Sequence, residues 1–326
     1  MPMRTITLEE HYTSPAFLAG PGSQLRRPAP TRPGMGQIVD QLSDVGQRRI
    51  AEMDAGGIDV QVLSLNSPGV EQLEVPEAVT MARQTNDWLA QAIQNYPERL
   101  AGFATLPTQD PKTAAGELER TVREFGFKGA AINGHTRGRY LDDEFFWPIL
   151  ERAEALKVPI YIHPTLPPQP VIKAYYTGNF SPEVTGMLAM AGWGWHIETA
   201  VHILRLILSG AFDRYPGLQV IIGHLGEGLT SMMSRIDHTL PGQVTKLKRP
   251  TGAYLRENLH YTFSGFNYTA PFLDLMLNVG GERIMFSADY PYASMAEAVA
   301  FLEHLPVSPA DKERIAHGNA ERLLRI

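Results

Sequence analysis

Short runs of β-branched and aliphatic residues alternate along the chain with longer segments whose apolar residues recur every three or four positions. The short runs are typical of buried strands, and the longer spacing is typical of one face of a helix. The predicted strands are 4–8, 59–65, 100–106, 129–133, 158–163, 218–223, 259–264 and 283–287. The predicted helices are 44–55, 77–95, 111–125, 143–156, 198–212, 228–239, 271–279 and 295–304.

This strand–helix alternation predicts an α/β fold with a parallel sheet. A pattern repeated along the whole chain favours a closed (β/α)8 TIM barrel over an open sheet. Length alone would allow two domains, but barrels of this size commonly form one. We therefore expect a single barrel domain over residues 1–326.

Two connections are much longer than such folds need, at residues 12–43 and 164–195. Both are rich in proline, and the second also carries several tyrosine and tryptophan residues. Each follows a predicted strand and precedes a helix, which is the side of a TIM barrel where active sites form. We expect these long loops to cover the carboxyl-terminal face, and surface decoration is the alternative.

Composition limits the chemistry. The chain has no cysteine, which excludes disulfides, zinc ribbons, iron–sulfur clusters and thiol nucleophiles. Any metal must be bound by imidazole and carboxylate groups. The net charge of −6 and the lack of a long basic run argue against nucleic acid as a partner. With no signal-peptide pattern and no membrane-length apolar stretch, a soluble cytoplasmic protein without a membrane partner is expected.

Residues that can bind a metal stand at the ends of four predicted strands. They are Glu9 and His11 after the first, His163 at the end of the fifth, His224 and Glu227 after the sixth, and Asp289 after the eighth. Strand ends of a barrel converge on one mouth, so these side chains are expected to meet. Glu9 and His11 are two positions apart and leave the same face of an extended strand, whereas Glu10 points the other way.

Each of these residues also has a structural interpretation. A lone histidine such as His163 is commonly a hydrogen-bonded core residue. Asp289 can cap a following helix, and Glu227 stands where a helix dipole favours a carboxylate. It is the shared position at four strand ends that favours a site.

The other histidines do not share this pattern. The set formed by His196, Glu198 and His202 lacks the spacing of a zinc-protease helix, so these residues are interpreted as structural. His135 follows the fourth strand and remains a candidate substrate contact.

These motifs resemble the amidohydrolase superfamily. The residues that carry this resemblance are the Glu9-x-His11 pair, His163, the Gly-His224-x-Gly-Glu227 segment and Asp289. More narrowly, they and the stretch 192–200 resemble its non-oxidative aromatic decarboxylases of the γ-resorcylate (2,6-dihydroxybenzoate) decarboxylase type, related to aminocarboxymuconate-semialdehyde decarboxylase. The resemblance extends over nearly the whole chain.

The resemblance implies that Glu9, His11, His163 and Asp289 bind one divalent metal ion. It implies that Asp289 and His224 are catalytic and that Glu227 orients His224. It also implies that Arg235 belongs to the substrate pocket. Binuclear members carry a lysine at the end of the fourth strand, where this chain has Asn133, Gly134 and His135, so one metal is expected. A homo-oligomer, dimer or tetramer, is also implied.

Two carboxylates and two imidazoles suit Mn²⁺ or Zn²⁺, whereas nitrogen donors make Mg²⁺ less favoured. A carboxylate and an ortho-phenolate of a substrate can chelate such an ion, while Asp289 delivers a proton to the ring carbon as general acid. The expected function is metal-dependent, non-oxidative decarboxylation of a hydroxylated aromatic acid. Predicted substrate contacts also include aromatic residues that core packing would equally explain: Trp193, Trp195, Tyr290 and Tyr175.

Two alternatives remain. A hydrolase of the same superfamily would use a metal-activated water whose proton Asp289 takes. The Glu9-x-His11 motif, in place of two histidines, and the missing lysine argue against it. A non-catalytic metal-binding barrel is the third hypothesis, and the intact set of ligands together with His224 argues against it.

Overall fold

A computed structural model describes residues 3–26 and 35–326 of the chain. Its strands form two parallel ladders in the orders β1-β2-β3 and β4-β5-β6-β7-β8-β9. Their bounds are β1 Ile6–Tyr12, β2 Val60–Leu65, β3 Leu100–Gly102, β4 Ala104–Thr105, β5 Ala130–Asn133, β6 Ile160–His163, β7 Val220–Ile222, β8 Leu259–Thr262 and β9 Ile284–Met285. Strand neighbours in space are therefore strand neighbours in sequence.

The two ladders close into one barrel through backbone hydrogen bonds at both gaps. The amide of Phe103 donates to the carbonyl of Leu63 at 2.9 Å, so β3 and β4 are one strand interrupted at this residue. The amide of Leu8 donates to the carbonyl of Phe286 at 3.3 Å and joins β1 to the end of β9. The predicted (β/α)8 TIM barrel is thus confirmed.

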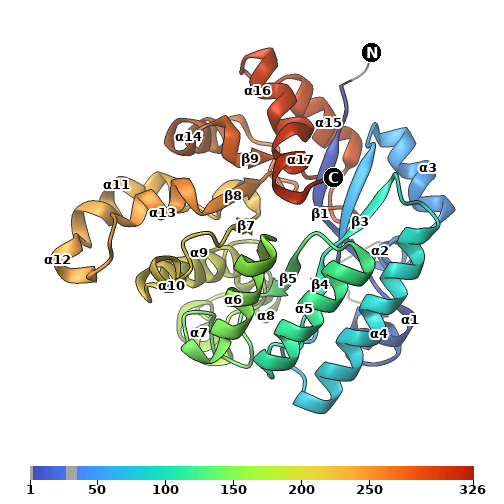
Figure 1. Ribbon diagram of the computed structural model, residues 1–326, viewed down its shortest axis with the longest axis horizontal. Coiled ribbons are helices and arrows are strands. Elements are labelled where there is room, and N and C mark those ends of the chain that lie inside the picture. The colour runs from blue at the N-terminus through green and yellow to red at the C-terminus, as the bar shows by residue number, and fades with distance from the viewer. Residues whose placement is uncertain (1–2, 27–34) are drawn as a thin grey trace.

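Helices cover the outside of the barrel (Figure 1). Eight of them coincide with the predicted helical segments: α3 Gln47–Gly56, α4 Val75–Gln94, α5 Pro111–Phe125, α6 Trp147–Leu156, α9 Gly194–Leu208, α11 Leu229–Thr239, α14 Thr269–Val279 and α15 Met295–Glu303. Helix α5 shows why the boundaries could be predicted. Asp110 accepts the amide of Thr113 at its start, and Gly126 ends it with a left-handed φ of 70°.

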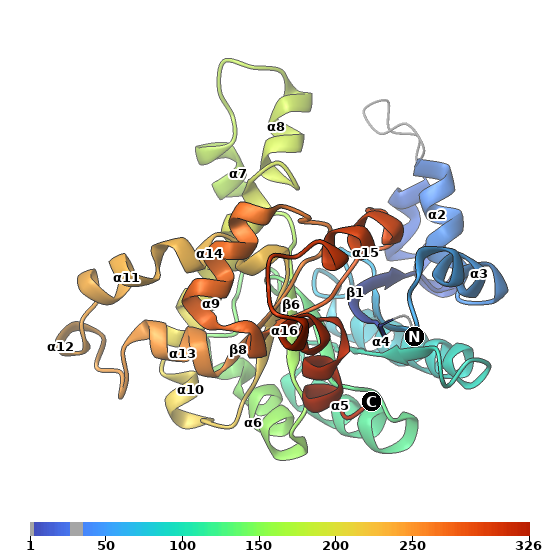
Figure 2. The ribbon, with the colours of Figure 1, turned by 90° about the horizontal axis from the view of Figure 1, so that it is seen from above.

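The long connections contain helices that periodicity did not predict. They are α1 Pro15–Ala19, the 3-10 helix η1 Pro21–Arg26 and α2 Met35–Ser43 in the first, and α7 Gln169–Tyr175 and α8 Pro182–Ala189 in the second. Residues 27–34 of the first connection lie outside the described residues. Figure 2 shows α7 and α8 projecting from the barrel as an arm. Short helices outside the barrel wall complete the chain: α10 Ala211–Arg214, α12 Gly242–Thr245, α13 Thr251–Glu257, α16 Pro309–Glu313 and α17 Asn319–Leu324.

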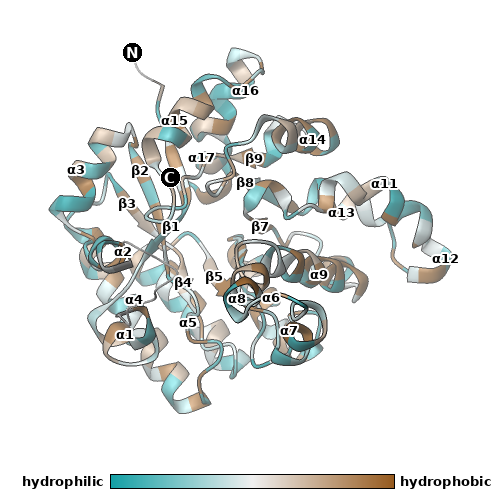
Figure 3. Ribbon diagram, turned by 180° about the vertical axis from the view of Figure 1, so that it is seen from behind, coloured by the Kyte–Doolittle hydropathy of each residue, from teal (hydrophilic) through white to brown (hydrophobic). Residues whose placement is uncertain are grey.

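One apolar cluster fills the inside of the barrel, and another lies between the strands and the helices. Ile6, Leu8 and Val62 of alternate strand positions belong to the inner cluster, which also includes Ala320 and Leu324 of α17. Helix α17 therefore covers the amino-terminal end of the barrel, and the opposite end is left for the site. Figure 3 shows hydrophilic residues along outer helices such as α3. Among the described residues, no helix is long and apolar enough to span a bilayer.

The first strand is longer than the predicted 4–8. Its pairing with β2 shifts register between Thr7 and Glu10, and Glu9 adopts a left-handed φ of 64°. After this bulge the ladder resumes and continues to Tyr12. The bulge lies where the predicted metal ligands begin.

Candidate active site

Five side chains converge on one buried region at the carboxyl ends of the strands. Glu9 Oε1 lies 3.4 Å from His163 Nε2 and 3.9 Å from His224 Nε2. His11 Nε2 lies 3.1 Å from Asp289 Oδ1. Ligand atoms of Glu9, His11 and His163 all lie within 4.8 Å of one another. Residues that are up to 280 positions apart in sequence thus lie together. We call Glu9, His11, His163 and Asp289 the metal-ligand cluster, and His224 stands beside it.

The two oxygens of Glu9 have different surroundings. Oε2 accepts hydrogen bonds from the hydroxyl groups of Tyr161 and Ser264, and from Thr262 Oγ1 at 3.3 Å. Oε1 is buried and has no hydrogen-bond partner within the described residues. A Cβ at Gly223 would lie 2.3 Å from Glu9 Oε2, so glycine makes room for this carboxylate. The hydroxyl groups therefore orient Glu9 with one oxygen directed at His163 and His224.

The histidines of the cluster are in the state that binds metals. Burial lowers the pKa of His11 to about 4 and, together with the neighbouring His11 ring, the pKa of His163 to about 3. Both imidazoles are neutral at pH 7, with lone pairs available for a cation. An unpartnered carboxylate oxygen, two neutral imidazoles and the Asp289 carboxylate fit one divalent cation.

Asp289 is held at the cluster by its neighbours in the chain. It has a left-handed φ of 66°, and the amides of Ala288 and Tyr290 on either side donate to Glu10 at 2.9 and 3.1 Å. Glu10 therefore points away from the cluster, as predicted. Burial raises the pKa of Asp289 to about 7. An aspartic acid of this kind can carry a proton near neutral pH.

His224 and Glu227 form a hydrogen-bonded pair beside the cluster. His224 Nδ1 donates to Glu227 Oε1 at 2.8 Å, and both side chains are buried. Burial opposes a charge on His224, but the carboxylates of Glu227 and Glu9 outweigh it and raise its pKa to about 10. The backbone has five consecutive positive φ values over residues 224–228, so the chain turns tightly where this pair stands.

His196 joins this pair, which corrects its interpretation as a structural residue away from the site. Its Nδ1 lies 2.6 Å from Glu227 Oε2, and its ring centroid lies 4.6 Å from that of His224. The spacing of His196 to other histidines in the sequence did not indicate a site, but its place in the order of elements could have done so. It follows the second long connection directly, at the start of α9 on the carboxyl side of the barrel.

Sequence comparison agrees with this geometry. The amidohydrolase family model matches residues 41–326. The gamma-resorcylate decarboxylase of Polaromonas sp. is 38% identical over 333 residues, which cover 98% of each chain. The chain belongs to the amidohydrolase family. Within that family it is a carboxy-lyase.

Two solved structures resemble this amidohydrolase along its whole length. A dihydroxybenzoic acid decarboxylase from Polaromonas sp., with bound manganese and the inhibitor 2-nitroresorcinol, is 38% identical with a TM-score of 0.89, covering 99% of this chain and 97% of that one. A 5-carboxyvanillate decarboxylase from Novosphingobium aromaticivorans, with manganese and a nitrobenzoic acid, is 35% identical with a TM-score of 0.90, covering 100% and 97%.

The predicted aromatic contacts of this amidohydrolase lie in different places. Trp195 is half-buried next to the site, and its Nε1 lies 3.1 Å from His196 Nε2. Trp193 stands directly before α9 and Tyr175 ends α7, and they are 56% and 77% exposed. The role of these three residues as substrate contacts stays a prediction.

Tyr290 points in another direction. Its hydroxyl donates to Glu52 Oε2 at 2.6 Å, and the guanidinium of Arg49 lies 4.6 Å from its ring centre. Both partners belong to α3, so the ring packs toward this helix instead of toward His11 or His163. Arg235 is exposed on α11, which Figures 1 and 2 show extending away from the barrel.

Two aromatic residues beside the cluster were missed by the sequence analysis. The ring of Tyr292 lies 5.7 Å from that of His11, and its hydroxyl donates to Asn66 Oδ1 at 2.7 Å. The ring of Phe266 lies 5.1 Å from His224 and, edge-on, 5.1 Å from His196. Both stand in turns after strands, where no periodicity marks a direction for the side chain.

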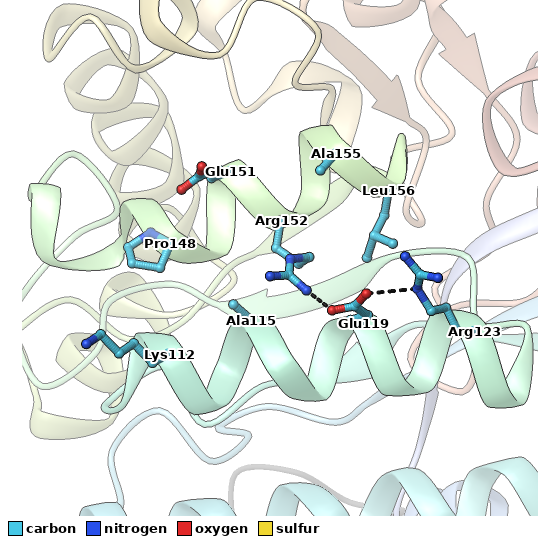
Figure 4. A pocket seen from close by; sticks show the side chains of 9 residues that line it. All are labelled: Lys112, Ala115, Glu119, Arg123, Pro148, Glu151, Arg152, Ala155 and Leu156. Carbon is cyan, nitrogen blue, oxygen red and sulfur yellow. Dashed lines mark ion pairs between the residues drawn. The ribbon is translucent and has the colours of Figure 1, made fainter.

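A separate cavity of about 520 Å³ lies between α5 and α6 (Figure 4). Glu119 in its floor pairs with both Arg152 and Arg123. None of the clustered histidines or carboxylates lines it. It lies on the outer helices, away from the strand ends that carry the cluster, and it is not part of the active site.

Proposed function

We propose that this amidohydrolase is a metal-dependent, non-oxidative decarboxylase of a hydroxylated benzoic acid with a hydroxyl group ortho to the carboxylate. The observation that carries the proposal is the convergence of Glu9, His11, His163 and Asp289 beside His224. Its most similar relatives support the substrate class, because they are named for dihydroxybenzoates and 5-carboxyvanillate.

Glu9, His11, His163 and Asp289 would hold one divalent cation. Manganese suits this mixed oxygen and nitrogen set and is bound in two related structures. Zinc suits the same donors, and magnesium suits them less. The bound cation supplies a Lewis acid that stabilises the negative charge of the substrate carboxylate and phenolate.

Asp289 is the proposed general acid. Its carboxyl group lies at the cluster, 3.1 Å from His11 Nε2, where it would deliver a proton to the ring carbon that bears the substrate carboxylate. The carbon–carbon bond to the carboxylate then breaks, its electron pair restores the aromatic ring, and CO₂ leaves. Asp289 is left as a carboxylate and regains its proton from water before the next turnover.

His224 is proposed to hold the substrate carboxylate. Glu227 occupies its Nδ1, so Nε2 is directed at the cluster, and a raised pKa keeps this nitrogen protonated. A protonated imidazole donates a charge-assisted hydrogen bond to a carboxylate oxygen. The ring edge of Phe266 and the half-buried Trp195 supply apolar surface near this position for an aromatic substrate.

We also propose that the chain forms a homo-oligomer. The arm formed by α7 and α8, together with the turn that follows it, exposes four apolar side chains. They are Tyr175, Val184, Met187 and Trp193. Figure 3 shows α8 as largely hydrophobic. Such a surface is commonly covered in an assembly. Arg235 of α11, Trp193 and Tyr175 are retained as candidate substrate contacts.

The test is a CO₂-release screen on purified protein reconstituted with manganese, combined with elemental analysis. 2,6-Dihydroxybenzoate and 5-carboxyvanillate are the first substrates, and 4-hydroxybenzoate, which lacks the ortho hydroxyl, is the matched control. Release of CO₂ from an ortho-hydroxy acid but not from the control supports the proposal. Cleavage of an amide or ester without CO₂ would favour the hydrolase instead.

A further inference from the structure

The buried carboxylate of Glu227 has two imidazole partners. Oε1 accepts from His224 Nδ1 at 2.8 Å, and Oε2 accepts from His196 Nδ1 at 2.6 Å. Phe266 packs against both rings. The proposed reaction uses His224, while His196 has no part in it so far.

This arrangement determines which nitrogen of each ring binds Glu227 and which way the other nitrogen, Nε2, faces. Since each carboxylate oxygen serves one ring, both Nδ1 atoms carry a proton. Nε2 of His224 therefore faces Glu9, at 3.9 Å. Nε2 of His196 faces residues 191–195 at the start of α9 instead. It lies 3.1 Å from Trp195 Nε1 and 3.1 Å from the carbonyl oxygen of Ala191. His196 connects that segment to the carboxylate that orients His224.

We infer that His196 is a positioning residue for His224. Through Glu227 it fixes the ring so that Nε2 is presented to the substrate, and it ties this ring to residues 191–195 at the start of α9. The inference rests on the proposed function, which takes His224 as the group that meets the substrate.

Burial makes the role of His196 necessary. Without it, Glu227 Oε2 would be a buried carboxylate oxygen without a hydrogen-bond donor, which is costly in a dry environment. The side chain of Glu227 would then turn toward another donor and release the ring of His224. A cation shared by His196, His224 and Glu227 is less consistent with the geometry, because nitrogen–oxygen separations of 2.6 and 2.8 Å are those of hydrogen bonds.

Two variants separate the hydrogen bond from the bulk of the side chain. His196→Phe keeps a ring but removes the donor to Glu227. His196→Asn is smaller but keeps an N–H group at the position of Nδ1. His202→Phe is the matched control, because His202 is also buried on α9 but its ring contacts Tyr140 and the amide of Leu141, not Glu227.

With manganese bound, His196→Phe is expected to lower kcat about tenfold or more, as is common when a residue that orients a functional histidine is lost. KM should stay within about threefold, because the lost contact does not bind substrate directly. His196→Asn should recover most of kcat, and His202→Phe should keep it. Unchanged kcat in His196→Phe, or equal losses in His196→Phe and His202→Phe, would overturn the inference.

A second measurement does not depend on activity. Proton NMR of metal-free protein labelled with ¹⁵N-histidine should show two slowly exchanging downfield protons on the Nδ1 atoms of His196 and His224. His196→Phe should lose the sharp His224 proton, whereas His196→Asn and His202→Phe should keep it. Persistence of that proton in His196→Phe would overturn the inference, as would a second manganese equivalent lost with His196. Absence of CO₂ release by the wild type would instead count against the proposed function alone, since the NMR result stands by itself.

Discussion

The carboxyl group of Glu10 holds the chain on both sides of Asp289. Its Oε1 accepts the amide of Ala288 at 2.9 Å, and its Oε2 accepts the amide of Tyr290 at 3.1 Å. Glu10 is fully buried and stands between the two proposed ligands Glu9 and His11 in the first strand. One side chain thereby couples the first strand to the left-handed turn after β9 that presents Asp289.

Glu10→Gln is expected to loosen this turn. The amide oxygen of glutamine can accept one backbone N–H, but its NH₂ group would face the other, leaving a buried donor unpaired at a cost of about 1–3 kcal/mol. Urea unfolding of the metal-free protein and manganese content by elemental analysis should both show a loss. Glu77→Gln, at an exposed position of α4, is the control. Equal behaviour of the two variants would contradict this role.

Asp289→Asn is expected to abolish turnover while the protein stays folded. An amide has no proton of suitable acidity to deliver to the ring carbon, and its size matches that of the carboxylic acid. CO₂ release should fall at least about a hundredfold, within the usual range for loss of a general acid. Circular dichroism checks the fold. A wild-type rate would refute the general-acid role.

His163→Ala is expected to empty the metal-ligand cluster. It removes a neutral imidazole whose Nε2 lies 3.4 Å from the unpartnered oxygen of Glu9. Elemental analysis after dialysis should find manganese in the wild type and little in the variant. His304→Ala, an exposed histidine at the end of α15, is the control. Full manganese occupancy in His163→Ala would remove His163 from the proposed ligands.

Stability should decrease as the pH falls below about 6.5. Burial lowers the pKa of His260 to about 3, below the value of 6.5 for an unperturbed histidine. Between these values the unfolded chain binds a proton that the folded chain does not, so stability present above pH 6.5 is lost toward pH 3, at about 1.4 kcal/mol per pH unit. Urea unfolding of metal-free protein at pH 7 and pH 5 measures the loss. His260→Gln should lose less, and an identical pH dependence would contradict this account.

Sequence reasoning found the strand ends but not the directions of the turns that follow them. Asp289 lies at the cluster, whereas Tyr290 turns to α3 and Tyr292 turns to His11. The left-handed φ of Asp289 redirects the chain at this point, and periodicity carries no such information. His196 was missed for a related reason, since its partner Glu227 is 31 positions away and contact between them depends on the packing of α9.

The sequence by itself determined three things: the order of strands and helices, the absence of thiol chemistry and the types of group at four strand ends. Each depends only on composition or on the spacing of nearby residues, which need no knowledge of the fold. Tertiary structure decided which oxygen of Glu9 is unpartnered, which nitrogen of each histidine faces the cluster and which aromatic rings lie beside it. These are relations between segments that meet only when the barrel closes, and burial then sets the charge of each group.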